Sequence, residues 1–172
     1  MQQLYLTGPH AADLADRLFT ALNVQPAGYR LLPFSVGGAV RGECLHLLTP
    51  PASPMDNDVP CRIRLHPGDW TIVPRVLEEI AAPSLLRALT LCKPILLSGL
   101  NARMLTCPAF REAVVTLLTS PRPVIIAADD DAEEHLRALT PADTQLWAPV
   151  PNSVEGRRAL LEELIAEAAM RL

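Results

Sequence analysis

The beginning of this 172-residue sequence constrains its fold most strongly, because a strand pattern there runs through a glycine turn into a helix pattern. Leu4–Leu6 predict a buried strand, Thr7–Ala12 predict a turn, and a helical pattern opens at Asp13. Loops that bind phosphate are built in this way, since a helix N-terminus offers free N–H groups and the positive end of its dipole. The segment therefore predicts an α/β architecture that starts with a loop of this kind.

The residues that bind a phosphate in such loops are missing from this one. A functional motif reads Gly, four residues, Gly, Lys, and Ser or Thr. With Gly8 as the first position, the second Gly falls on Asp13, the Lys on Leu14 and the hydroxyl residue on Ala15. A carboxylate at Asp13 would also compete with an anionic ligand for the helix N–H groups. We call this segment the remnant loop; it comprises Gly8, Pro9, His10, Ala11, Ala12, Asp13, Leu14 and Ala15.

Length and composition exclude several classes of protein. The chain suits one domain, expected over residues 1–172, which buries a core without disulfides. Apolar residues make up 49%, but no run reaches the ~20 residues of a membrane helix, and the first residues do not resemble a secretory signal. A net charge of −4 and 4% aromatic residues disfavour nucleic-acid binding. We expect a cytoplasmic protein with no membrane or nucleic-acid partner and with unpaired cysteines.

Strand and helix patterns alternate along the chain, which predicts an α/β domain with a mainly parallel central sheet. A Gly-Gly turn at 37–38 pairs two of the strands as a hairpin, so the region from 28 to about 65 is interpreted as a β-hairpin insertion. Pro83 divides a helical stretch into either two helices or one kinked helix. The expected strands are 28–34, 44–48, 61–65, 94–97, 124–127 and 145–147. Residues 66–69 are expected to end the strand 61–65, and residues 50–60, with their cluster of prolines, and 98–106 are expected to be loops.

Four segments, in the same order along the chain, are similar to sequence motifs of one protein family. They are Leu6–Pro9, Gly28–Arg30 with the Gly-Gly turn, Glu78–Leu89 and, most specifically, Cys107–Val114, which is close to Ser-Pro-Ala-Phe-Arg-Glu-Ala-Val. The family that they resemble is that of the small bacterial and archaeal P-loop nucleoside-triphosphatases related to human cancer-related nucleoside-triphosphatase. The resemblance implies a three-layer P-loop NTPase-like fold. Counting back from Pro108, the family's Walker B Asp-Glu pair falls on Ser98 and Gly99.

The resemblance therefore implies a protein that has lost catalysis. Phosphoryl transfer depends on a Lys and on Mg²⁺ to neutralise charge, and residues for both are absent from the aligned positions. Our first hypothesis is a binding or regulatory module without cofactor or hydrolysis, whose partner is a protein or a small non-phosphate ligand. The alternative is a residual nucleoside-triphosphatase that holds ATP or GTP with Mg²⁺ at the remnant loop, helped by Arg30 or Arg103.

Two minor alternatives concern thiols and metals. Cys44 and His46 are expected on the same face of a strand. With Cys61 or His66 they could provide ligands for a tetrahedral zinc site, or they could form a thiol site. Cys107 begins a helix and is the candidate for a reactive thiol. The spacing of these residues is not that of a known zinc motif, and the sequence favours no metal site.

Three further features have ordinary structural explanations. The acidic run Asp129–Asp131 could hold a cation but is expected to cap the helix after it. Arg62 and Arg64 are expected to remain solvated. Asn152 or Ser153 should cap a long terminal helix, and the apolar stripe of this helix should cover the sheet. The stripe consists of Leu160, Leu161, Leu164, Ile165, Ala168 and Leu172.

Overall fold

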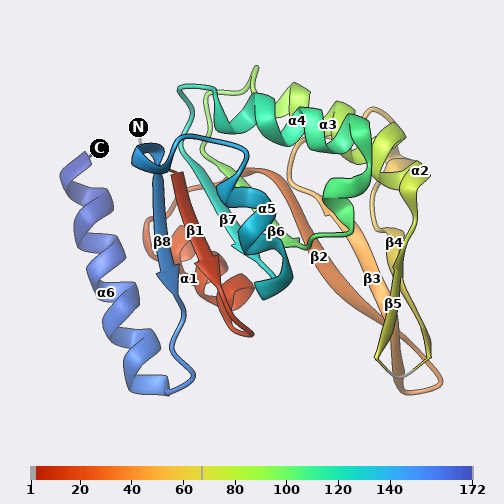
Figure 1. Cartoon of the computed structure of the whole chain (residues 1–172), viewed down its shortest axis with the longest axis horizontal. Helices are drawn as coiled ribbons and strands as arrows, with labels where there is room; N and C mark the ends of the chain where they lie inside the picture. Colours follow the sequence, from red (N-terminus) through yellow and green to blue (C-terminus); the bar gives the residue numbers. More distant parts are fainter. Residues whose placement is uncertain (1–2, 67, 172) are drawn as a thin grey trace.

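A computed structural model describes residues 3–66 and 68–171, and the strands in these ranges form one eight-stranded sheet (Figure 1). The strand order is β5-β4-β3-β2-β6-β7-β1-β8. The neighbours from β2 to β8 pair in parallel, and β3, β4 and β5 extend the sheet in antiparallel fashion beyond β2. The strands are β1 (Gln3–Thr7), β2 (Ala27–Val36), β3 (Ala39–Leu47), β4 (Val59–His66), β5 (Asp69–Ile72), β6 (Ile95–Leu100), β7 (Val124–Ala128) and β8 (Gln145–Pro149).

Helices cover both faces of the parallel part, which gives three layers (Figure 1). On one face α1 (Ala11–Ala21) and α6 (Val154–Arg171) pack over a core that includes Leu6 and Leu96. The other face carries α2 (Pro74–Val76), a π-helical turn (Leu77–Ala81), α3 (Ala82–Ala88), α4 (Pro108–Leu118) and α5 (Glu133–Arg137). Apolar runs such as Ile95–Leu97 suit strands that are buried on both faces. The predicted three-layer α/β fold with a mainly parallel sheet is confirmed.

Short 3₁₀ turns connect several of these elements. They are Pro54–Asp56, Met104–Thr106, Asp130–Ala132 and Ala142–Thr144. The first lies in the loop between β3 and β4, which the proline cluster of that region predicts. The second lies between β6 and α4, and the third joins β7 to α5.

The antiparallel extension is larger than the predicted insertion of residues 28–65. The β2–β3 hairpin turns at Gly37 and Gly38 as expected, but β4 is followed by β5, a strand that the sequence patterns did not predict. The segment 66–69, expected only to end a strand, instead joins two paired strands, and its Pro67 lies outside the described residues. The extension therefore continues to Ile72.

A single helical stretch follows β5, so the kinked-helix interpretation of Pro83 is close to the structure. The stretch passes from α2 through the π-helical turn Leu77–Ala81 into α3 without a break. Proline lacks the N–H that an α-helix needs and its ring crowds the preceding turn. The wider π turn, which ends two residues before Pro83, accommodates both effects.

The terminal helix covers the sheet as predicted. Ser153 is its cap, because its Oγ accepts a hydrogen bond from the Gly156 N–H at 3.1 Å. Of the predicted stripe, Leu164 is buried and Leu160, Leu161 and Ile165 pack against the same core cluster, whereas Leu172 lies outside the described residues.

Candidate functional site

The remnant loop and the Ser98–Gly99 pair lie at the same edge of the sheet. Thr7 is the register partner of Ala128, and Ala128 is the partner of Leu100, so β7 lies between the two segments. Two strand spacings separate the ends of β1 and β6 by about 10 Å. Because α/β proteins bind ligands at the carboxyl edge of a parallel sheet, this edge is the candidate ligand-binding region.

The connection between β1 and α1 is short. Only Gly8, Pro9 and His10 lie between the two elements, because α1 begins at Ala11 rather than at the predicted Asp13. A functional phosphate motif spans eight positions between strand and helix. Here residues 11–15, the last five positions of the motif, lie inside α1, and the side chains of Leu14 and Ala15 are fully buried in the core between helix and sheet.

The Asp13 carboxylate does not occupy the helix N–H groups, contrary to the competition that we expected. It is exposed and lies 4.0 Å from the Arg17 guanidinium on the next turn of α1. His10 is the N-cap residue, and its side chain makes no capping hydrogen bond. Asp13 therefore opposes an anion through its charge in the first turn rather than by occupying the same donors.

Ser98 and Gly99 belong to β6 and not to a loop, as had been expected for 98–106. Ser98 is buried and is the register partner of Arg30 on β2. Gly99 has a φ of +91°, and a Cβ on it would lie 2.9 Å from the Leu31 side chain. The space that a catalytic side chain would need at position 99 is therefore filled by Leu31.

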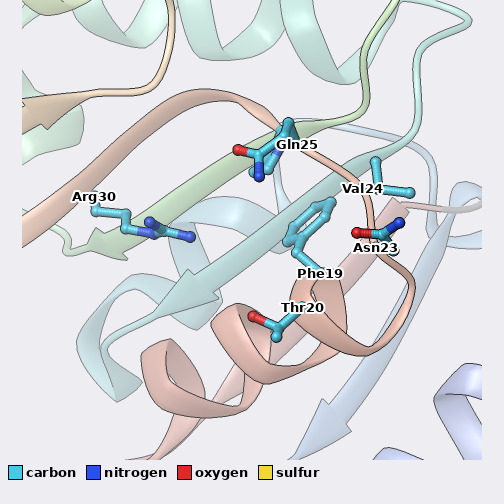
Figure 2. A pocket seen from close by; sticks show the side chains of 7 residues that line it. Phe19, Thr20, Asn23, Val24, Gln25 and Arg30 are labelled. Carbon is cyan, nitrogen blue, oxygen red and sulfur yellow. The ribbon is translucent and has the colours of Figure 1, made fainter.

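Arg30 and Arg103, the two cations considered for nucleotide binding, are not brought together. Arg30 Nε donates to the Asp16 carboxylate at 2.6 Å and lines a cavity of about 290 Å³ near the end of α1. Figure 2 shows Arg30 on β2 and Phe19 on α1 at this cavity. Arg103 instead donates to the Trp70 carbonyl and lines a different cavity. The remnant loop contributes no residue to either cavity.

Arg62 is not solvated, contrary to prediction, but contacts residues of β3, of β5 and of the segment after β7. Its guanidinium donates to Glu43 on β3 at 3.3 Å and to Asp129 after β7 at 3.0 Å, and it lies 4.6 Å from the centre of the Trp70 ring. Burial raises the pKa of both the Glu43 and the Asp129 carboxyl, and Arg62 partly offsets this increase. Arg64 also lies near Trp70, at 5.8 Å.

The acidic run after β7 does not cap the next helix with its side chains. Asp129 is the N-cap residue of the 3₁₀ turn but makes no capping bond, because its carboxylate pairs with Arg62. The Asp131 carboxylate accepts a hydrogen bond from the Ala102 N–H at 3.2 Å, across the gap between the β7 and β6 ends. These carboxylates therefore connect neighbouring loops at the sheet edge.

The thiol and metal candidates do not assemble into a site. His46 Nδ1 lies 2.7 Å from the Asp58 carboxylate, while Cys61 is buried in the core and burial raises its pKa to about 12. Burial also raises the pKa of the Cys107 thiol, which disfavours the reactive thiolate. Within residues 3–66 and 68–171, no group of three His, Cys, Asp or Glu side chains could hold a metal ion.

A second cavity, which the sequence patterns did not reveal, lies beside Arg62. It has a volume of about 160 Å³ and is lined by Arg62, Gly68, Trp70, Thr71, Ile72, Asn101, Arg103 and Asp131. The signal that could have found it is the Pro-Gly pair at 67–68, followed by the strand-forming residues Trp70–Ile72. This pattern predicts the β4–β5 hairpin that forms one wall.

The arrangement of strands and helices is that of the P-loop NTPase-like fold, and three residues connect β1 to α1. The chain is similar to the crystal structure of THEP1 from the hyperthermophile Aquifex aeolicus, with a TM-score of 0.72 and 15% sequence identity over 96% of this chain and 98% of that one. This likeness establishes the fold. No protein-family model and no curated protein matches the sequence.

None of the helices in the described part of the chain is both long enough and apolar enough to cross a bilayer.

Proposed function

We propose that this chain is a P-loop NTPase-like protein that acts by binding, without nucleotide hydrolysis. Its target in this proposal is a protein partner or a small ligand that is not a phosphate ester. The observation that carries the proposal is the short β1–α1 connection, which places Leu14 and Ala15 in the core at the positions where the motif needs Lys and Ser or Thr.

A second, independent position supports the same proposal. The Walker B carboxylates are replaced by Ser98 and Gly99, and Leu31 fills the space next to Gly99. Phosphoryl transfer needs both a cation on the phosphates and a carboxylate for the metal. Loss at both places removes the means of catalysis and much of the affinity for Mg-nucleotide.

The contacts of the two arginines do not favour the alternative of a residual nucleoside-triphosphatase. Arg30 is held in an ion pair with Asp16, and Arg103 faces the second cavity. Neither contacts the remnant loop through any hydrogen bond or ion pair in the described residues.

Thermal unfolding with Mg-ATP and with Mg-GTP tests the proposal. A nucleotide at 100 times its Kd stabilises a protein by about 2.7 kcal/mol, which raises the Tm of a domain of this size by about 5 °C or more. We expect no change in Tm relative to MgCl₂ alone. A clear increase, accompanied by phosphate release that disappears in Gly8→Val, would establish the nucleotide-binding alternative instead.

A further inference from the structure

The cavity beside Arg62 is built at the edge of the sheet where α/β proteins bind their ligands. Asn101 and Arg103 come from the segment after β6, Asp131 from the segment after β7, and Trp70 and Thr71 from β5. The volume of about 160 Å³ equals that of about five water molecules. The part of a ligand that this cavity holds therefore has only a few heavy atoms.

The wall of this cavity is held in place by contacts on several sides. The Asn101 Oδ1 accepts a hydrogen bond from the Met104 N–H at 3.1 Å, and Arg103 donates to the Trp70 carbonyl. Arg62 lies over the Trp70 ring. These contacts hold the Trp70 side of the cavity and the turn after Asn101 in place.

One polar group in the wall lacks a partner. The Asn101 side chain is 2% exposed, and its Nδ2 makes no hydrogen bond within the described residues. A buried donor without an acceptor is costly, typically 1–3 kcal/mol. The group is suited to a ligand that brings an oxygen acceptor, which reaches the nitrogen when the Asn101 side chain turns toward the cavity, because less than 1 Å² of this atom is accessible.

The charges around the cavity limit which acceptor fits. Arg62 is already neutralised by Glu43 and Asp129, whereas Arg103 forms no ion pair in the described part of the chain. Asp131 stands in the same wall and would repel a doubly charged anion. One free cation and one free amide donor suit a singly charged carboxylate, which accepts several hydrogen bonds at once.

We infer that the cavity lined by Asn101, Arg103 and Asp131 binds the carboxylate group of a small organic acid. The carboxylate oxygens receive hydrogen bonds from the Asn101 amide and the Arg103 guanidinium. If the acid is an amino acid, its ammonium group pairs with Asp131. The inference rests on the proposed function, in which the chain acts by binding, and it names the class of small ligand.

Titration of the full ¹⁵N-labelled chain with sodium propionate, L-alanine and inorganic phosphate at equal ionic strength tests this inference. We expect propionate and alanine to cause saturable shifts of the Asn101 side-chain NH₂ resonances, and phosphate to cause none. Equal affinities for propionate and alanine assign a simple carboxylate as the ligand. Tighter binding of alanine that disappears in Asp131→Asn assigns an amino acid.

Two variants remove the proposed donors. Asn101→Asp keeps an oxygen for the Met104 N–H but replaces the NH₂ donor, and it should raise the Kd by about tenfold or more. Arg103→Gln alters an exposed residue and should also raise the Kd for the carboxylate. The test therefore does not depend on whether the Asn101→Asp variant folds. Asn152→Asp, at an exposed position before α6, is the matched control and should leave the Kd unchanged.

Three results would overturn the inference: no saturable shift with either carboxylate, equal binding of phosphate, or carboxylate binding that both Asn101→Asp and Arg103→Gln leave unchanged. These results concern the cavity alone, so the proposed function would stand as long as Mg-nucleotide leaves the Tm unchanged. Conversely, nucleotide binding at the remnant loop would refute the proposed function whatever the carboxylate titration shows.

Discussion

Arg62 joins the antiparallel extension to the parallel body, because it contacts Glu43 on β3 and Asp129 after β7. The Arg62 side chain is 18% exposed, whereas those of Glu43 and Asp129 are 25% and 41% exposed. Removal of the cation would leave two partly desolvated carboxylates without compensation. Such a loss costs about 3–5 kcal/mol in a fully buried pair and less where solvent screens the charges.

We predict that Arg62→Met lowers the free energy of unfolding at neutral pH by about 2 kcal/mol and changes its pH dependence. The folded-state pKa values of Glu43 and Asp129 are raised above their ordinary values of 4.5 and 3.8. The folded state therefore holds more protons within that window, and stability falls as the pH rises from the ordinary values through the raised ones. Without Arg62 the raised values move higher and the window extends toward neutral pH.

Urea unfolding followed by circular dichroism between about pH 4 and pH 8 measures this effect. The control is Arg158→Met, which removes a well exposed ion pair with Glu162 on α6 and should leave the pH profile as it is in the wild type. An Arg62→Met profile that parallels the wild-type profile would show that the two carboxylates do not depend on Arg62.

Gly99 is a second residue whose replacement has a specific cost. Its φ of +91° strains any other residue, and the added Cβ of Gly99→Ala would lie 2.9 Å from Leu31. We predict a loss of about 2–4 kcal/mol in the free energy of unfolding, measured in urea. Gly37→Ala is the matched control: its φ is +61° and nothing lies within 4 Å of the added Cβ, so it should lose only about 1 kcal/mol. Equal losses would mean that Leu31 moves aside.

At the scale of elements, the parallel strands could be predicted from sequence better than the extension. Continuous apolar runs identify β6 and β7, because strands buried on both faces need apolar side chains at every position. The four residues of β5 give no such signal, since a short edge strand is only half buried. The contact of Arg62 with Asp129 joins residues 67 positions apart and depends on the strand order, which local patterns do not reveal.

The cap of α6 gives a test at the scale of one element. The Ser153 Oγ satisfies the Gly156 N–H, one of the four donors without a partner at a helix start. We predict that Ser153→Ala lowers the free energy of unfolding by about 1 kcal/mol in urea. Asn152→Ala, one residue earlier, should change it much less, and a reversed order of the two would assign the cap to Asn152.

At the scale of the whole molecule, burial is uneven along the sheet. Side chains of β1 and β6 such as Tyr5, Leu6 and Leu97 are fully buried. Near the ends of the hairpins, by contrast, Val36, Val40 and Leu65 are 62%, 44% and 58% exposed. Figure 1 shows β3, β4 and β5 on the side of the sheet away from β8 and α6. Because local stability follows the number of buried contacts, the two parts should not open together.

We predict that amides in the tip of the β2–β3 hairpin, residues 35–41, exchange with solvent through local opening. Amides of β1, β6 and β7 should exchange only through global unfolding, because helices cover these strands on both faces. Native-state hydrogen exchange at increasing low concentrations of denaturant measures both free energies. The exchange of the core strands should depend on denaturant with the slope of global unfolding, while that of the tip should be almost independent of it. A common free energy and slope for both sets of amides would show that the extension and the parallel body unfold as one cooperative unit.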